Sequence, residues 1–247
     1  MPTFDPTTPM QRLALSGSDY GFSATRLDAL GSSEYTLVAI AADQSGSVGR
    51  FQGDIEACLG EIVRACGASP RADQLMLRLV AFDGSLHEVH GFQPLPTLDP
   101  ARYAGCLHTG GCTALYDAAH NAVASVVSYG DALGRGDFAV NGVVFVLTDG
   151  CDNQSSVDAA AVRQALADAV ASEQLESLRA ILVGVDVGAS TSQELMRFSA
   201  EAGFDDYVAI ATADAATLQR LARFATRSIA LSSTALGTGA PVASLSF

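Results

Sequence analysis

Three oxygen-bearing side chains, those of Asp43, Ser45 and Ser47, follow directly after an apolar run in the sequence. The run from Leu37 to Ala42 shows no polar alternation, so it predicts a strand of a parallel sheet that is buried on both faces. One carboxylate and two hydroxyl groups at alternate positions suit a hard cation such as Mg²⁺. The same residues could instead only cap the helix that the apolar periodicity predicts from Val48 onward. The triplet alone leaves both interpretations open.

Two further residues of the same chemical character lie far along the chain. Thr113 follows Gly110-Gly111-Cys112, where paired glycines allow a sharp turn before a helix predicted to run through Val127. Asp149 comes after a second apolar run, Val143 to Leu147. Open α/β sheets bind ligands at the edge where the strand order reverses. We therefore expect Asp43 and Asp149 to lie close together at that edge. Thr113 could cap its helix or point its hydroxyl into the same cleft.

The elements that must position these residues alternate along the chain between apolar strands and amphipathic helices. This alternation predicts an α/β fold with a doubly wound, mostly parallel sheet and helices on both faces. Asp83-Gly84 is a hairpin signal, so the residues after it should return as an antiparallel edge strand. After the first helix we expect strands at 75–82, 85–92, 180–185 and 207–211, and helices at 155–172, 192–202 and 214–231.

Composition limits the partners and the compartment. The chain has 247 residues, 49% of them hydrophobic, with a formal net charge of −13 and five cysteines. Duplex nucleic acid and anionic membranes need a basic surface, so neither is expected as a partner. Neither a membrane helix nor a signal peptide is indicated, and the odd number of dispersed cysteines fits a cytoplasmic protein. All 14 basic residues are arginine, which together with abundant alanine indicates a GC-rich bacterial genome.

The chain divides into three parts by composition. Prolines and Gly-Ser pairs interrupt residues 1–34, which predicts an extension on the domain surface or a segment ordered by a partner. Residues 35–232 carry the alternation of strands and helices and form the domain. Residues 233–247 contain glycines and a proline and predict an irregular tail, with a short strand beside the amino-terminal extension as the alternative.

Other reactive side chains suggest alternative chemistry. A zinc site could be formed by Cys106, His108, Cys112 and Cys151. The first two of these are closer in sequence than two zinc ligands usually are. Cys112 alone could be a nucleophile near a helix start, or a small residue tolerated in the turn. His87 and His90 are three positions apart on the expected edge strand, so they should face opposite sides and not share a metal.

Three arginines, Arg220, Arg223 and Arg227, share one face of the last predicted helix because they are three and four residues apart. Such a stripe is typical of a solvated face that complements the negative carboxyl end of the helix. A docking surface for an acidic partner is the alternative.

Taken together, three motifs resemble the metal-ion-dependent adhesion site (MIDAS) of von Willebrand factor A domains. They are Asp43-x-Ser45-x-Ser47, Gly-Gly-Cys-Thr113-Ala-Leu and Leu-Thr-Asp149-Gly, in the family's order and structural context. The resemblance implies a Rossmann-like, six-stranded sheet with one antiparallel edge strand. It also implies hydroxyl ligands from Ser45, Ser47 and Thr113, and carboxylates from Asp43 and Asp149, bound directly or through water.

In this family an acidic residue of the partner completes the coordination of the metal. The resemblance covers about residues 35–232. It implies a non-catalytic adaptor that binds a protein presenting Asp or Glu. Mg²⁺ is the expected ion because the hydroxyl-rich shell is small, and Mn²⁺ or Ca²⁺ could also bind. Stand-alone bacterial members often serve AAA-type ATPases or stress and defence systems. The sequence departs from the family pattern at Cys112 and Val48, and neither change removes a ligand.

Two other functions remain open at this point. A metal-dependent hydrolase, either a phosphatase or a nuclease, could use the same oxygen cluster. It would also need a base or nucleophile beside the metal, and the histidine nearest in sequence is His108. A self-assembling structural protein could place its own acidic residue in the open coordination position. Because the net charge repels acidic partners at long range, a metal bridge would have to act locally.

Overall fold

The computed structural model describes residues 9–15, 18, 20–172, 175–236, 238 and 247. In this part of the chain, one sheet has the strand order β1-β2-β5-β4-β3-β6-β7-β8. The strands are β1 (Met10–Leu13), β2 (Phe22–Thr25), β3 (Glu34–Asp43), β4 (Leu75–Phe82), β5 (Leu86–Pro94), β6 (Ala139–Thr148), β7 (Leu178–Val185) and β8 (Asp206–Ile210). The α-helices are α1 (Gln52–Gly67), α2 (Leu115–Gly134), α3 (Ala159–Ala171), α4 (Ala189–Ala202) and α5 (Ala215–Ala235). The expected α/β class is confirmed.

Strand β3 lies at the centre of the sheet because its side chains are apolar on both faces. Every residue from Tyr35 to Asp43 is buried, and the strand pairs in parallel with β4 and β6. Asp43 lies opposite Phe82 of β4, and Ala42 lies opposite Leu147 of β6. The strand order reverses here, since β4 is added on one side of β3 and β6 on the other. The loops after β3 and β6 therefore meet at the carboxyl edge of the sheet.

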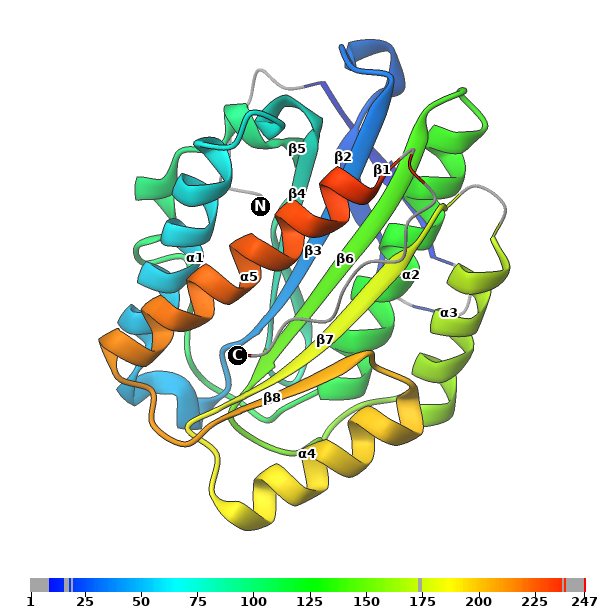
Figure 1. Cartoon of the computed structure of the whole chain (residues 1–247). Helices are drawn as coiled ribbons and strands as arrows, with labels where there is room; N and C mark the ends of the chain where they lie inside the picture. The colour runs from blue at the N-terminus through cyan, green and yellow to red at the C-terminus, as the bar shows by residue number, and fades with distance from the viewer. Residues whose placement is uncertain (1–8, 16–17, 19, 173–174, 237, 239–246) are drawn as a thin grey trace.

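Helices cover both faces of the sheet (Figure 1). α1 and α5 pack on one face and α2, α3 and α4 on the other, and each layer forms an apolar core with alternate strand residues. Val38 and Ile40 belong to the core under α1 and α5, whereas Leu37 and Ala39 belong to the opposite core. This is the two-residue period of a strand that is covered on both sides. No helix among the described residues is both long and apolar enough to span a bilayer.

The amino-terminal segment adds two strands, which corrects the expected number of six. β1 and β2 pair antiparallel, and Ala24 of β2 pairs in parallel with Phe92 of β5. Phe22 and Ala24 are buried, and Ser23 donates hydrogen bonds from its backbone N and its hydroxyl to Glu88 of β5. Strands of four residues are too short to show a periodicity, and their partner lies far along the chain. Residues 1–8 of the expected extension and 239–246 of the expected tail lie outside the described residues.

Most of the other elements form within a few residues of their expected ends. The Asp83-Gly84 turn joins β4 to the antiparallel β5, as the hairpin signal predicted. Three boundaries differ from expectation. α2 ends at Gly134, seven residues beyond the expected Val127. α2 begins at Leu115 with Ala114 at its N-cap, so Thr113 does not cap this helix. α5 continues to Ala235, one turn beyond the expected end, and the added turn includes the buried Ser232 and Ser233.

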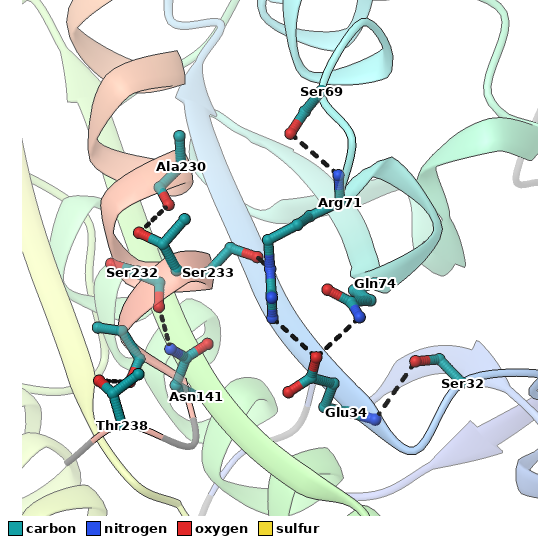
Figure 2. Close-up of polar contacts among 12 residues, drawn as sticks. Ser32, Glu34, Ser69, Arg71, Gln74, Asn141, Ala230, Ser232, Ser233 and Thr238 are labelled. Carbon is teal, nitrogen blue, oxygen red and sulfur yellow. Dashed lines mark hydrogen bonds and ion pairs between the residues drawn. The ribbon is translucent and has the colours of Figure 1, made fainter.

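The carboxyl-terminal half of α5 is joined to the amino edge of the sheet by polar contacts (Figure 2). Arg71 Nε donates to Ser233 Oγ at 2.9 Å, and Arg71 Nη2 pairs with Glu34 Oε1 at 3.0 Å. The side-chain amide of Asn141 in β6 donates to the carbonyl oxygen of Ser232 at 2.6 Å. These contacts lie at the edge opposite the loops that follow β3 and β6. They hold the helix in place without involving the candidate site.

Candidate metal centre

Three loops meet at the carboxyl edge of the sheet: one follows β3, one precedes α2 and one follows β6. The first includes the short 3-10 helix η2 (Gly46–Arg50). Backbone hydrogen bonds join it to the second loop, from Gly110 N to Gln44 O at 2.9 Å and from Gly46 N to Gly111 O at 3.5 Å. Gly111 has φ of 73°, a left-handed conformation that glycine adopts without a Cβ clash. The paired glycines therefore allow the second loop to lie against the first.

A continuous series of contacts joins four of the five predicted ligand residues. The backbone N of Ser45 donates to Asp43 Oδ1 at 2.7 Å. The hydroxyl oxygens of Ser45 and Ser47 are 3.2 Å apart, and Ser47 Oγ donates to Asp149 Oδ1 at 2.8 Å. The side chains at the ends of β3 and β6 therefore form one polar cluster at the point where the strand order reverses.

Thr113, the fifth predicted ligand, is joined to the loop that carries Asp149 by hydrogen bonds of its backbone. Its backbone N donates to Asn153 Oδ1 at 2.8 Å, and Asn153 N donates to the Thr113 carbonyl oxygen at 3.0 Å. Asn153 belongs to the loop that carries Asp149, so these bonds join the second loop to the third. Thr113 is 5% exposed. Among the described residues its hydroxyl makes no hydrogen bond to Asp43 or Asp149, so its role as a ligand stays a prediction.

The two carboxylates lie where burial disfavours their negative charge. Asp43 is 1% exposed, and burial raises its pKa to about 6 despite the hydrogen bonds that it accepts. Burial also raises the pKa of Asp149, although Ser47 and the positive charge of Arg50 act in the opposite direction. Arg50 itself forms its ion pair with Asp186. Within the described part of the chain neither carboxylate of the cluster has an arginine as an ion-pair partner, a deficit that a bound cation would remove.

The donor set of this cluster fits a hard cation. Carboxylate and hydroxyl oxygens are the ligands that Mg²⁺ and Ca²⁺ prefer. No three side chains of the His, Cys, Asp or Glu type converge anywhere in the described ranges, so an ion at this edge would depend on the hydroxyl groups as well. Hydroxyl ligands are neutral, so a divalent ion that fewer than two carboxylates contact directly would keep net positive charge and attract an anionic ligand.

Gln44 and Thr148, which are next to predicted ligands but were not themselves predicted, also organise the site. Gln44 Oε1 accepts from His108 N at 3.0 Å, which adds a side-chain bond between the first two loops. Thr148 Oγ1 donates to Asp43 Oδ2 at 2.6 Å and so orients the buried carboxylate. In the sequence, the only indication of their role is that they are next to Asp43 and Asp149. Their partners lie in distant segments, which no local pattern reveals.

The alternative sites receive different support from the geometry. Cys106, His108, Cys112 and Cys151 all lie in described segments, where no metal-binding group of three such side chains occurs. Burial raises the pKa of the Cys106 thiol to about 12, so this side chain is a neutral thiol at pH 7 when no metal is bound. Cys112 is exposed, and its role as a nucleophile stays a prediction.

The expectation that His87 and His90 face opposite sides of β5 is wrong. His87 pairs with Ala81 and His90 with Leu79, two residues of one core, because a β-bulge between these pairs breaks the alternation. His87 is exposed at the strand end, whereas His90 is buried and bonds to Tyr103.

Comparisons with known proteins bear on the fold. No family model matches the sequence, and no curated protein does. Among solved structures, the PilB minor pilin from Streptococcus sanguinis is 15% identical with a TM-score of 0.57, over 84% of this chain and 64% of its own. The pilus adhesin SpaC from Lactobacillus rhamnosus GG is 13% identical with a TM-score of 0.57, over 90% and 33%. Proximal thread matrix protein 1 from the mussel byssus, solved with a zinc-occupied MIDAS motif, is 14% identical with a TM-score of 0.55, over 80% and 48%.

This chain therefore spans less than two thirds of the length of each of these three proteins. At identities of 13–15% the likeness concerns the fold alone. The strand order, the helices on both faces and these structural neighbours agree on one architecture. The chain has a von Willebrand factor A-like fold.

Proposed function

We propose that this chain is a metal-dependent protein-binding module. In this proposal a divalent cation, Mg²⁺ in the first place, is held by Asp43, Ser45, Ser47, Thr113 and Asp149. An Asp or Glu of a partner protein completes its coordination. The observation that carries the proposal is the unbroken series of contacts from Asp43 to Asp149 through the two serines. One end of that series is a buried carboxylate that lacks a positive partner in the described part of the chain.

In this proposal the buried side chains hold the cation, and the exposed ones lie where the partner would bind. Asp43 is buried and oriented by neighbouring donors, so its carboxylate keeps one orientation. Ser47 is exposed and Asp149 is half-buried, so this end of the cluster faces solvent. A cation bound here would supply the positive charge that attracts a carboxylate from solution. Arg50 and Asp186 form an ion pair near Asp149, and their opposite charges act on its carboxylate in opposite directions, so the positive charge of the site would come from the cation.

Binding fits these contacts better than hydrolysis. The hydroxyls of Ser45 and Ser47 bond to each other and to Asp149, and not to a histidine that could act as a base. His108, the histidine nearest in sequence to a predicted ligand, contacts the site through its backbone N. Two structural neighbours are described as a minor pilin and a pilus adhesin, names that fit adhesion better than catalysis. An AAA-type ATPase or a stress or defence component as partner, and the cytoplasmic location, stay predictions.

The test is partner capture from the native host in Mg²⁺ and in chelator. The site variant is Ser47→Ala/Asp149→Asn, and the matched control is Ser33→Ala/Asp73→Asn, whose exposed side chains lie at the opposite edge of the sheet. Wild type and control should retain the partner in Mg²⁺, and the site variant and all chelated samples should lose it. Calorimetry with Mg²⁺ and Mn²⁺ should show metal binding at least about tenfold weaker in the site variant.

Other outcomes would assign a different function. A partner recovered equally in Mg²⁺ and in chelator, by wild type and site variant alike, contradicts a metal bridge. Turnover of phosphate esters or nucleic acid that disappears in Ser47→Ala/Asp149→Asn would assign a metal-dependent hydrolase. A chelator-dependent change in the size of the purified wild type on gel filtration would assign metal-dependent self-assembly.

A further inference from the structure

A second candidate surface lies on the solvent side of α5 and shares no residue with the predicted metal centre. Arg220, Arg223 and Arg227 are exposed and share one face of this helix. Together with Phe224 and Phe247 they line a shallow pocket of about 180 Å³. The guanidinium carbon of Arg220 is 4.8 Å from the centre of the Phe247 ring, and that ring packs edge-on against Phe224. The pocket thus combines three positive charges with an aromatic wall.

Among the described residues these three arginines form no ion pair, unlike most of the other arginines, although the charge of Arg220 acts on the exposed Asp214 at the start of α5. Arg135 pairs with Asp131 at 2.8 Å, and Arg71 pairs with Glu34 at 3.0 Å. Within a chain of net charge −13, three neighbouring positive charges without a described ion-pair partner are unexpected.

The end of α5 removes the simpler explanation of the arginine stripe. Cations complement a helix dipole within the last turn, where the carbonyl groups are unsatisfied. α5 continues to Ala235, and its last turn contains no basic residue. Arg227 is eight positions before that end, so complementing the helix terminus does not account for the three charges.

Size and chemistry together indicate what the pocket accepts. Small-molecule sites usually enclose about 300–1,000 Å³, and a pocket of about 180 Å³ has room for a single side chain. Guanidinium groups pair with carboxylates in a fixed planar geometry, and the aromatic wall favours an apolar neighbour. We propose that Arg220, Arg223, Arg227 and Phe247 dock an acidic segment of a partner protein, with carboxylates on the arginines and an apolar side chain against Phe247.

This docking does not rest on the proposed metal bridge. α5 begins near the loop that follows β3 (Figure 1), but the pocket of the three arginines includes none of the predicted metal ligands. Binding at α5 should therefore be independent of divalent cations. It should weaken with rising salt, because exposed charge pairs are screened over about 8–10 Å.

The test uses the full chain and a fluorescein-labelled peptide of about ten residues, rich in glutamate with one central leucine. Fluorescence anisotropy measures its affinity for wild type, for Arg220→Gln/Arg223→Gln/Arg227→Gln, and for a control. The control, Arg26→Gln/Arg64→Gln/Arg135→Gln, removes the same charge from exposed arginines that have ion-pair partners. All six side chains are exposed, so both variants should fold, and circular dichroism checks this.

We expect the α5 variant to bind the peptide about tenfold more weakly or worse, from the loss of three exposed charge pairs. The control should bind within about twofold of wild type, chelator should have no effect, and Phe247→Ala should weaken binding of the leucine-containing peptide. Equal losses in the two triple variants would overturn the proposal, because bulk charge would then explain binding. Tighter binding of inorganic phosphate than of the peptide at the α5 arginines would also overturn it, as would no peptide binding by wild type at low salt.

Discussion

Replacing Glu88 by Gln should destabilise the fold strongly, because Glu88 is the counter-charge of a buried arginine. The Arg78 side chain is 1% exposed, and its Nε donates to Glu88 Oε2 at 3.0 Å. Its other nitrogens bond to the neutral groups of Ser125 at 3.2 Å and Asn121 at 2.9 Å. Burial lowers the pKa of Arg78, and the charge of Glu88 acts in the opposite direction. The carboxylate is therefore what keeps a charged guanidinium tolerable inside the sheet.

The magnitude follows from the charge that stays behind. Removing one member of a buried ion pair costs about 3–5 kcal/mol, out of a total free energy of unfolding of about 5–15 kcal/mol for a typical domain. Glu88 also accepts from the backbone N and hydroxyl of Ser23, so the loss extends to the anchoring of β2. The matched control, Glu61→Gln, breaks a pair with Arg64 whose side chains are 38% and 66% exposed. It should cost less than about 1 kcal/mol.

Urea denaturation followed by circular dichroism gives the free energy of unfolding of wild type, Glu88→Gln, Arg78→Met and the double variant. The double variant removes both charges, so it should be more stable than Glu88→Gln alone. A loss below about 1 kcal/mol for Glu88→Gln would refute the reasoning. A double variant as unstable as the sum of the two single losses would refute it equally.

Strand β2 and a buried histidine give three further tests. Gly91→Ala would place a Cβ against the backbone oxygen of Ser23, so it should lower the free energy of unfolding by about 1–3 kcal/mol, as measured by thermal unfolding. The control Gly53→Ala should not lower it, because the space around its Cβ is open. Deleting residues 1–34 removes the buried Phe22 and opens the edge of β5, so the melting temperature should fall; an unchanged value would show that the extension is separate from the domain. Burial lowers the pKa of His90 to about 4. Because the unfolded chain keeps a histidine pKa near 6.5, stability should fall by about 3 kcal/mol as pH drops from about 6.5 to about 4. His90→Gln should make that fall shallower in urea titrations at successive pH values.

The parts of the fold that could be predicted are those with local periodicity. The apolar run from Leu37 to Ala42 identified the central strand, and the Asp83-Gly84 turn identified the antiparallel hairpin. The expectation that Asp43 and Asp149 share one sheet edge used only the rule for strand-order reversal, and the contact of Ser47 with Asp149 agrees with it. Each of these inferences needed a pattern within a short window of sequence.

The features that were not predicted, or were predicted wrongly, depend on contacts with residues far away in the chain. The strands of residues 10–13 and 22–25 are too short for a periodic signal, and they exist because β5 offers a free edge. Thr113 looked like a helix cap because it follows paired glycines, yet Asn153 binds its backbone and α2 begins later. The arginine stripe on α5 was readable from spacing, but its lack of described partners became visible only in three dimensions.

The sequence by itself determined the α/β class, the central strand and the oxygen-bearing residues at its end, because these depend on hydrophobic periodicity and on residue chemistry. Only the tertiary structure decided how the loops are bonded to each other and how the amino-terminal segment joins the sheet. Those outcomes depend on hydrogen bonds between residues far apart in the chain, such as Gln44 with His108 and Ser23 with Glu88. Such bonds form only after the strands have brought the two groups together, so no local pattern encodes them.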